Sequence, residues 1–162
     1  MRRITVQEAD FDATAELAAL SAGAGGIASF IGVVRGNVGG KVLAALRLEH
    51  YPGMTEKALE RLADAAAVRW ALTGCTIIHR IGRLTPGQNI VLVATASQHR
   101  AAALEATAYL IDQLKTAAPF WKAEEFADGT QAWVAARESD TNAADAWTEA
   151  RAENLPPDEG RL

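Results

Sequence analysis

Residues 75–116 read CTIIHRIGRLTPGQNIVLVATASQHRAAALEATAYLIDQLKT. Two apolar segments, Cys75–Ile81 and Ile90–Ser97, lie on either side of a turn that contains Pro86 and Gly87. Apolar runs of this length separated by turn residues are typical of a β-hairpin. The sequence therefore predicts two neighbouring antiparallel strands in the middle of the chain.

The segment after this hairpin predicts a helix from Ser97 to about Thr116. Ser97 is a suitable N-cap, and Pro119 cannot continue a helix. A narrow arc of this helix holds Leu104, Ala108, Ile111 and Lys115. Lys115 therefore borders the apolar stripe, either as a lysine whose stem covers apolar surface or as a partly desolvated amine suited to catalysis.

Further strand and helix patterns lie outward from this unit. Strands are predicted at Arg3–Glu8, Ile27–Arg35, Val42–His50 and Gln131–Ala135, and helices at Phe11–Leu20, 55–70 and Asn142–Ala152. Thr55 is expected to cap the second helix. In the strand before it, Leu46 and Leu48 alternate with charged residues, which predicts one buried face and one solvent-exposed face.

These patterns predict an α+β fold, with a mainly antiparallel sheet and two or three helices packed against it. The chain has 162 residues, of which 49% are hydrophobic, enough for one sizeable core but not for two. We expect one domain over residues 1–154, followed by a polar tail over 155–162.

Composition excludes several classes of function. A net charge of -4 argues against a general nucleic-acid binder, which needs many clustered cations. The single cysteine, Cys75, excludes an intramolecular disulfide, and its apolar surroundings predict a buried thiol. No signal peptide or membrane-length apolar run is visible, so a cytoplasmic protein is expected. The three histidines lack ligand spacing, so no bound metal is expected.

His99 and Arg100 occupy the first turn of the predicted helix. Cations there oppose the helix dipole unless an anion lies between them and the free backbone N–H groups. A phosphate-binding pair and a solvated surface pair are equally compatible with this position.

Lys115 lies fifteen positions after Arg100, so the two are about 22 Å apart along one helix. No small ligand spans that distance. If both serve one pocket, Lys115 of one protomer must meet His99 and Arg100 of another, which predicts a twofold dimer with composite sites.

Two further cations lie near predicted breaks in the chain. Arg35 ends a strand just before the glycine-rich residues 36–40, where side chains commonly reach over a pocket mouth. Lys122 follows the Pro119 break, where the chain reversal can return it toward Lys115. The intervening Phe120 and Trp121 are expected to be core anchors.

Six stretches together resemble the large subunit of molybdopterin synthase. They are FIGVVR at 30–35, LEHYPGMTEKAL at 48–59, IHRIGRLTPG at 78–87, SQHRAAALEA at 97–106, LIDQLKTAAPFWKAE at 110–124 and WVAARESD at 133–140. Their order and spacing make the resemblance specific over roughly residues 25–140.

The resemblance implies an α/β hammerhead fold and a sulfurtransferase without a cofactor. It implies a homodimer with a small ubiquitin-like sulfur carrier docked at each end, whose C-terminal Gly-Gly thiocarboxylate enters the pocket. The implied substrate is cyclic pyranopterin monophosphate, which receives two sulfur atoms to become the dithiolene of molybdopterin.

The resemblance also implies the site residues. Lys115 and Lys122 are the catalytic lysines. Because a partly desolvated lysine can move protons near neutral pH, we further assign Lys115 the acid/base role as a hypothesis. The substrate-binding set is Val33, Val34, Arg35, His99, Arg100, Lys115, Lys122, Ala123 and Glu124. His99 and Arg100 come from the partner protomer. Val33, Ala123 and Leu104 depart from the family pattern, and the first two reduce the positive charge of the pocket.

Three alternatives accompany this interpretation. Glu124 either orients Lys122 through an ion pair or lies as a solvated carboxylate on the rim. The chain as a whole could be a non-catalytic module that binds a ubiquitin-like partner, although the retained cations argue against it. An unrelated phosphate-ester hydrolase on a similar fold would need an acidic or cysteine cluster, which the sequence lacks.

Overall fold

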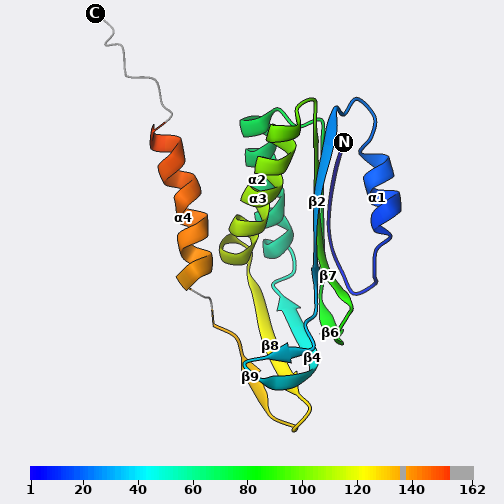
Figure 1. Ribbon diagram of the computed structural model, residues 1–162, viewed down its shortest axis with the longest axis vertical. Helices are drawn as coiled ribbons and strands as arrows, with labels where there is room; N and C mark the ends of the chain where they lie inside the picture. Colours follow the sequence, from blue (N-terminus) through cyan, green and yellow to red (C-terminus); the bar gives the residue numbers. More distant parts are fainter. Residues whose placement is uncertain (136–137, 154–162) are drawn as a thin grey trace, which may run out of the picture.

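The computed structural model describes residues 1–135 and 138–153 (Figure 1). The elements, in chain order, are β1 (Arg2–Gln7), α1 (Ala13–Ala19), β2 (Gly26–Val33), β3 (Asn37–Val38), β4 (Lys41–His50), α2 (Met54–Trp70), β5 (Gly74–Arg80), β6 (Gly82–Leu84), β7 (Asn89–Ser97), α3 (Arg100–Ala117), β8 (Phe120–Phe126), β9 (Gln131–Trp133) and α4 (Glu138–Glu153). The predicted tail, residues 155–162, lies outside the described residues.

The sheet with more residues, called the larger sheet below, has four strands in the order β1-β5-β7-β2. The predicted β5–β7 hairpin forms its centre, β2 pairs antiparallel with β7, and β1 pairs parallel with β5. Helices α2 and α3 cover one face of this sheet and α1 covers the other (Figure 1). The predicted α+β class with a mainly antiparallel sheet is confirmed.

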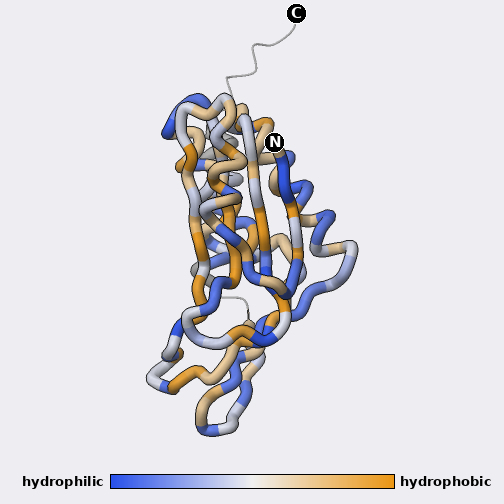
Figure 2. The backbone as a smooth tube through the Cα atoms, turned by 90° about the vertical axis from the view of Figure 1, so that its right-hand side faces the viewer, coloured by the Kyte–Doolittle hydropathy of each residue, from blue (hydrophilic) through white to orange (hydrophobic). Residues whose placement is uncertain are grey.

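The main core lies between this sheet and the pair α2 and α3. Its fully buried members include Leu59, Ile77, Val93 and Leu110. Figure 2 shows hydrophobic residues following the long strands, with hydrophilic residues in the loops at both ends. Cys75 belongs to this core, and burial raises the pKa of its thiol to about 12. The predicted buried thiol is therefore confirmed.

A smaller sheet extends below the first and has the order β3-β4-β8-β9, with β6 also paired to β4. Leu46 and Leu48 of β4 are buried, whereas Arg47 and Glu49 are exposed, as their alternation predicts. On the outer face, Arg83 and Arg47 donate to Glu125 at 2.8 and 3.2 Å. The hydrogen bond from Arg83 is the main cause of a lowered pKa at Glu125.

Strand β8 is absent from the strands that the sequence predicts. Its sequence, FWKAEEF, places charged residues on both faces and so lacks the apolar alternation that marks a strand. Pairing with β4 along seven registered positions determines its conformation instead. Trp121 on this strand is 48% exposed, so the prediction of a core anchor is wrong for Trp121. Phe120 packs against the main core as predicted.

Both predicted N-caps are wrong. Ser97 is the last residue of β7, and α3 begins with His99 as its N-cap, without a side-chain capping bond. The N-cap of α2 is Gly53, whose φ of 80° is readily adopted only by glycine. Thr55 is buried inside this helix, where its hydroxyl accepts from the Tyr51 N–H and donates to the Pro119 carbonyl, each at 3.0 Å.

Thr55 thus joins α2 to the residue just before β8. Replacing Thr55 by valine keeps the shape but removes two partly buried hydrogen bonds, each worth ~0.5–1.5 kcal/mol, so the free energy of unfolding should fall by ~1–3 kcal/mol. Denaturant unfolding measures this change. The exposed Thr14 provides the matched control. An effect of Thr14→Val as large as that of Thr55→Val would contradict the assigned role of these hydrogen bonds.

Helix α4 packs on α3, away from the larger sheet. Trp147 meets Trp70 and Tyr109 edge to face, and its indole N–H donates to Asp112 at 2.9 Å. Within residues 1–135 and 138–153, none of the helices combines the length and apolar character that crossing a membrane requires.

Candidate active site

Lys115 projects from the last turn of α3. Its neighbour Leu114 and the preceding Leu110 are buried in the main core, which fixes the direction of the helix. The Lys115 Nζ lies 3.1 Å from Oδ1 of Asp140, and the lysine side chain is 48% exposed. Lys115 is therefore a half-exposed amine beside a carboxylate. This agrees better with a lysine whose stem covers apolar surface than with a partly desolvated amine.

Lys122 comes from β8 and faces the apolar side of the smaller sheet. It lies opposite Leu48, and Glu124 lies opposite Leu46, so all four side chains share one face. Ala123 lies between them, opposite the exposed Arg47, and is buried on the other face. Because successive side chains of a strand point to opposite faces, the Ala123 side chain points away from Lys122 and Glu124. Ala123 therefore does not line either cavity, in contrast to the prediction.

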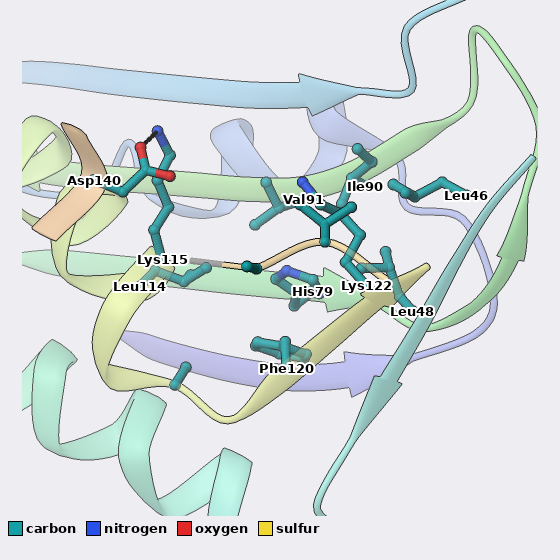
Figure 3. A pocket seen from close by; sticks show the side chains of 13 residues that line it. Leu46, Leu48, His79, Ile90, Val91, Leu114, Lys115, Phe120, Lys122 and Asp140 are labelled. Carbon is teal, nitrogen blue, oxygen red and sulfur yellow. Dashed lines mark hydrogen bonds and ion pairs between the residues drawn. The ribbon is translucent and has the colours of Figure 1, made fainter. Parts of the chain in front are cut away.

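Two adjoining cavities of about 290 and 420 Å³ meet at the two lysines. Both cavities are lined by Leu46, Ile90, Lys115, Lys122 and Asp140, and together they are called the lysine cleft below. Figure 3 shows Lys115 and Lys122 reaching from α3 and β8 toward β2, with the Lys115–Asp140 ion pair dashed. The lysine cleft therefore joins residues that lie far apart in the sequence.

The first cavity of the cleft is mainly apolar. Beyond the shared residues, it extends over Leu48, Leu114, Phe120 and Val134. The second cavity is more highly charged, since Arg35, Lys115 and Lys122 face it together with Glu124 and Asp140. Three cations against two carboxylates leave a net positive charge, which suits a small anion.

The end of β2 supplies one wall of the second cavity. Val33, Val34 and Arg35 all line it, and Val33 is 46% exposed whereas Val34 is buried. The structure therefore brings together six of the predicted site residues: Val33, Val34, Arg35, Lys115, Lys122 and Glu124.

His99 and Arg100 lie at the opposite end of α3. Because α3 is a single helix over Arg100–Ala117, the backbone positions of Arg100 and Lys115 are about 22 Å apart. Neither His99 nor Arg100 lines the lysine cleft of its own chain. The composite site across a dimer stays a prediction.

His79 and Asp140 are site residues that sequence reasoning missed. His79 lines the first cavity and stacks on Phe120 with ring centroids 3.8 Å apart. Its Nδ1 donates to the Arg80 carbonyl at 2.8 Å, and burial lowers its pKa to about 4. The partners of both residues belong to distant segments, so neither had a local signal. Among residues 1–135 and 138–153, no group of three or more His, Cys, Asp or Glu side chains is arranged to hold a metal ion.

The neutral state of His79 predicts a pH dependence of stability. Its pKa is about 4 in the folded chain and near 6.5 when unfolded, so the unfolded state binds the proton more tightly. The free energy of unfolding should therefore fall as the pH drops below 6.5 and level off below about 4, a total loss on the order of 3 kcal/mol. Denaturant unfolding across this range measures the slope.

The exposed His99 supplies the control for that measurement. His79→Gln should remove most of the slope between these pH values, whatever its effect on absolute stability, whereas His99→Gln should leave the slope in place. An unchanged slope in His79→Gln would show that His79 does not cause it.

The fold and the lysine cleft define an α+β protein in which a cavity with three cations adjoins a mainly apolar cavity. The model of the MoaE protein family matches residues 4–117. This chain belongs to the MoaE family.

Relatives agree with this assignment over nearly the whole chain. The molybdopterin synthase catalytic subunit of Mesorhizobium japonicum is 51% identical over 148 residues, covering 89% of this chain and 92% of that protein. The solved structure of the molybdopterin biosynthesis MoaE protein from Burkholderia ambifaria has a TM-score of 0.77 at 46% identity and covers 91% of this chain and 99% of that one.

A more distant neighbour is the complex of subunits 1 and 2 of molybdopterin-converting factor from Helicobacter pylori. It has a TM-score of 0.66 at 20% identity and covers 85% of this chain and 90% of that one. At this identity the likeness supports the fold alone.

Proposed function

We propose that this chain is the catalytic subunit of a cytoplasmic molybdopterin synthase. It moves sulfur from the C-terminal thiocarboxylate of a small ubiquitin-like carrier to cyclic pyranopterin monophosphate. The observation that carries the proposal is the convergence of Lys115 and Lys122, from α3 and β8, on one cleft with an apolar wall. Family membership and the name of the Mesorhizobium japonicum relative support it.

The two cavities suit the two reactants. A Gly-Gly tail has no side chains, so it fits a narrow channel with apolar walls such as the first cavity, lined by Leu48, Phe120 and Val134. The phosphate and pterin fit the second cavity, where Arg35 stands with the two lysines. The lysines lie where the cavities meet and therefore where the carrier sulfur would approach the pterin.

Each chemical step develops negative charge at that junction. The thiocarboxylate sulfur of one carrier forms a bond to a side-chain carbon of the pterin, while the bond from that carbon to a cyclic-phosphate oxygen breaks. The sulfur of a second carrier displaces the oxygen of the neighbouring carbon, which leaves as water. Water then hydrolyses the acyl link, leaving sulfur on the pterin and a carboxylate on the carrier. Fixed ammonium groups stabilise such charge without reorganising. Asp140 orients the Lys115 ammonium at 3.1 Å, and Lys115 moves the protons of the addition and hydrolysis steps.

His99 and Arg100 complete the phosphate site from a second protomer. They lie about 22 Å from Lys115 along their own helix, so they cannot serve the cleft of their own chain. A homodimer with two composite sites, each docking one carrier, gives a heterotetramer.

The test is incubation of the purified chain with cyclic pyranopterin monophosphate and a thiocarboxylated carrier. Mass spectrometry should detect the dithiolene product only when all three components are present. Carrier binding without any dithiolene would instead indicate a non-catalytic module that binds a ubiquitin-like partner, and would overturn the proposed reaction.

A further inference from the structure

His79 lies at the end of the main core, at a position where an apolar residue would be expected. Side chains alternate along β5, so His79 shares the face of the larger sheet that carries Cys75 and Ile77. Cys75 and Ile77 belong to the main core, whereas His79 lines the first cavity of the lysine cleft. His79 is only 5% exposed, and the proposed sulfur transfer does not use it. A polar side chain this deeply buried ordinarily has a hydrogen-bond partner for its polar atoms.

The two ring nitrogens of His79 differ in their partners. Nδ1 lies 2.8 Å from the Arg80 carbonyl oxygen, so Nδ1 carries the proton and donates it. Burial lowers the pKa of His79 to about 4, which keeps the ring neutral near pH 7. In a neutral ring with a protonated Nδ1, Nε2 is an acceptor. Among residues 1–135 and 138–153, no donor is hydrogen bonded to this Nε2.

The ring of His79 is held in one orientation. It stacks on Phe120 with an interplanar angle of 18°, and the bond to the Arg80 carbonyl fixes its rotation. Figure 3 shows the ring with Phe120 among the side chains that line the first cavity. The two nitrogens of an imidazole point in different directions, so Nε2 faces away from the Arg80 carbonyl. A ligand in the first cavity can therefore supply the donor that Nε2 lacks.

The chemistry of the first cavity determines which ligand can use this acceptor. Among the described residues that line it, the polar side chains are His79, Lys115, Lys122 and Asp140. The lysines only donate, and Asp140 is paired with Lys115 at 3.1 Å. A phosphate or carboxylate oxygen at His79 would meet the lone pair of Nε2 and be repelled, whereas a peptide N–H would be satisfied there. The neutral acceptor therefore favours a peptide over the phosphate of the pterin.

We propose that Nε2 of His79 accepts a hydrogen bond from a backbone N–H of the carrier's Gly-Gly tail. The inference rests on the proposed function and deepens it, because it names a partner for the tail inside the first cavity. The tail leaves water when it enters this mainly apolar cavity, so each of its N–H groups needs an acceptor. A neutral acceptor holds the N–H without attracting cations, and the anionic thiocarboxylate is left to Lys115 and Lys122.

Two substitutions separate the role of Nε2 from that of Nδ1. His79→Asn keeps a donor near the position of Nδ1 for the Arg80 carbonyl but has no acceptor at the position of Nε2. His79→Gln instead places an amide oxygen near the position of Nε2. Calorimetric titration with the carrier in its C-terminal carboxylate form measures Kd. His79→Asn should raise this Kd by ~5–30-fold, because a buried N–H loses its acceptor, whereas His79→Gln should bind about as tightly as wild type.

A carrier that lacks its two C-terminal glycines supplies the matched control. Wild type and His79→Asn should bind this shortened carrier with the same Kd, because the contact that His79 makes is with the tail. Equal weakening of both carriers by His79→Asn would show that the substitution acts through the fold and would overturn the inference. Unchanged binding of the complete carrier by His79→Asn would also overturn it, as would a loss in His79→Gln equal to that in His79→Asn.

The sulfur-transfer assay separates this contact from the proposed function. His79→Asn should leave KM for cyclic pyranopterin monophosphate unchanged, and a rise in that KM would place the pterin against His79 and contradict the inference. Dithiolene formation by wild type, with normal binding of the complete carrier by His79→Asn, would refute the contact alone. Tail-dependent binding that requires His79, without any dithiolene, would refute the reaction and leave the contact in place.

Discussion

Replacing Lys115 by alanine is expected to lower kcat for dithiolene formation by at least ~100-fold, the usual effect of removing a general acid or base. The ammonium stands at the junction of the two cavities, where charge develops, and its removal also leaves Asp140 facing the substrate without a counterion. Steady-state assays with saturating carrier measure the change.

Two variants separate the roles of this lysine. Lys115→Arg keeps the positive charge but cannot give up its proton near neutral pH, so it should recover substrate binding without recovering kcat. Lys57→Ala removes an exposed lysine of α2 outside the lysine cleft and should change neither quantity. Full activity in Lys115→Ala would remove Lys115 from the mechanism.

Replacing Arg100 by alanine should raise KM for the pterin substrate by ~10–100-fold, because a charge-assisted contact to phosphate is lost. The Arg100→Ala substitution also permits a test of the composite site, in which subunits of two different variants are mixed. Subunits of Lys115→Ala and Arg100→Ala, combined in equal amounts and allowed to exchange, should regain about a quarter of wild-type sites. Half of the dimers are then mixed, and each mixed dimer has one site with both residues intact.

That recovery distinguishes two arrangements. If Arg100 served the cleft of its own chain, every site in the mixture would carry one of the two substitutions. The activity of the mixture would then not exceed the baseline of the separate variants. Each variant assayed alone at the same total concentration supplies the baseline.

The hairpin and the long helix followed from local patterns, because their apolar residues repeat with the period of a strand or a helix. Strand β8 did not, since FWKAEEF carries Lys122 and Glu124 on the face that a strand ordinarily fills with apolar residues. A charged inner face lacks the apolar alternation of a half-buried strand, so it hides the element from any rule based on hydrophobicity.

The residues of the lysine cleft differ in how clearly the sequence marks them. Lys115 was visible because a cation beside an apolar stripe is unusual on a helix. His79 looks like an ordinary strand residue until Phe120 stacks on it, and Asp140 gains meaning only from its distance to Lys115. Ala123 was included because the family resemblance implies it, although strand alternation turns its side chain away from Lys122.

The most direct measurement follows the carrier's C-terminus by intact mass during the reaction. With the wild-type chain and cyclic pyranopterin monophosphate, two carriers should exchange their thiocarboxylate sulfur for oxygen for each dithiolene formed. Carriers should keep their sulfur when the pterin is omitted or when Lys115→Ala replaces the wild type. Sulfur loss at the same rate in all three mixtures, or no loss in the complete one, would contradict sulfur transfer at the two lysines.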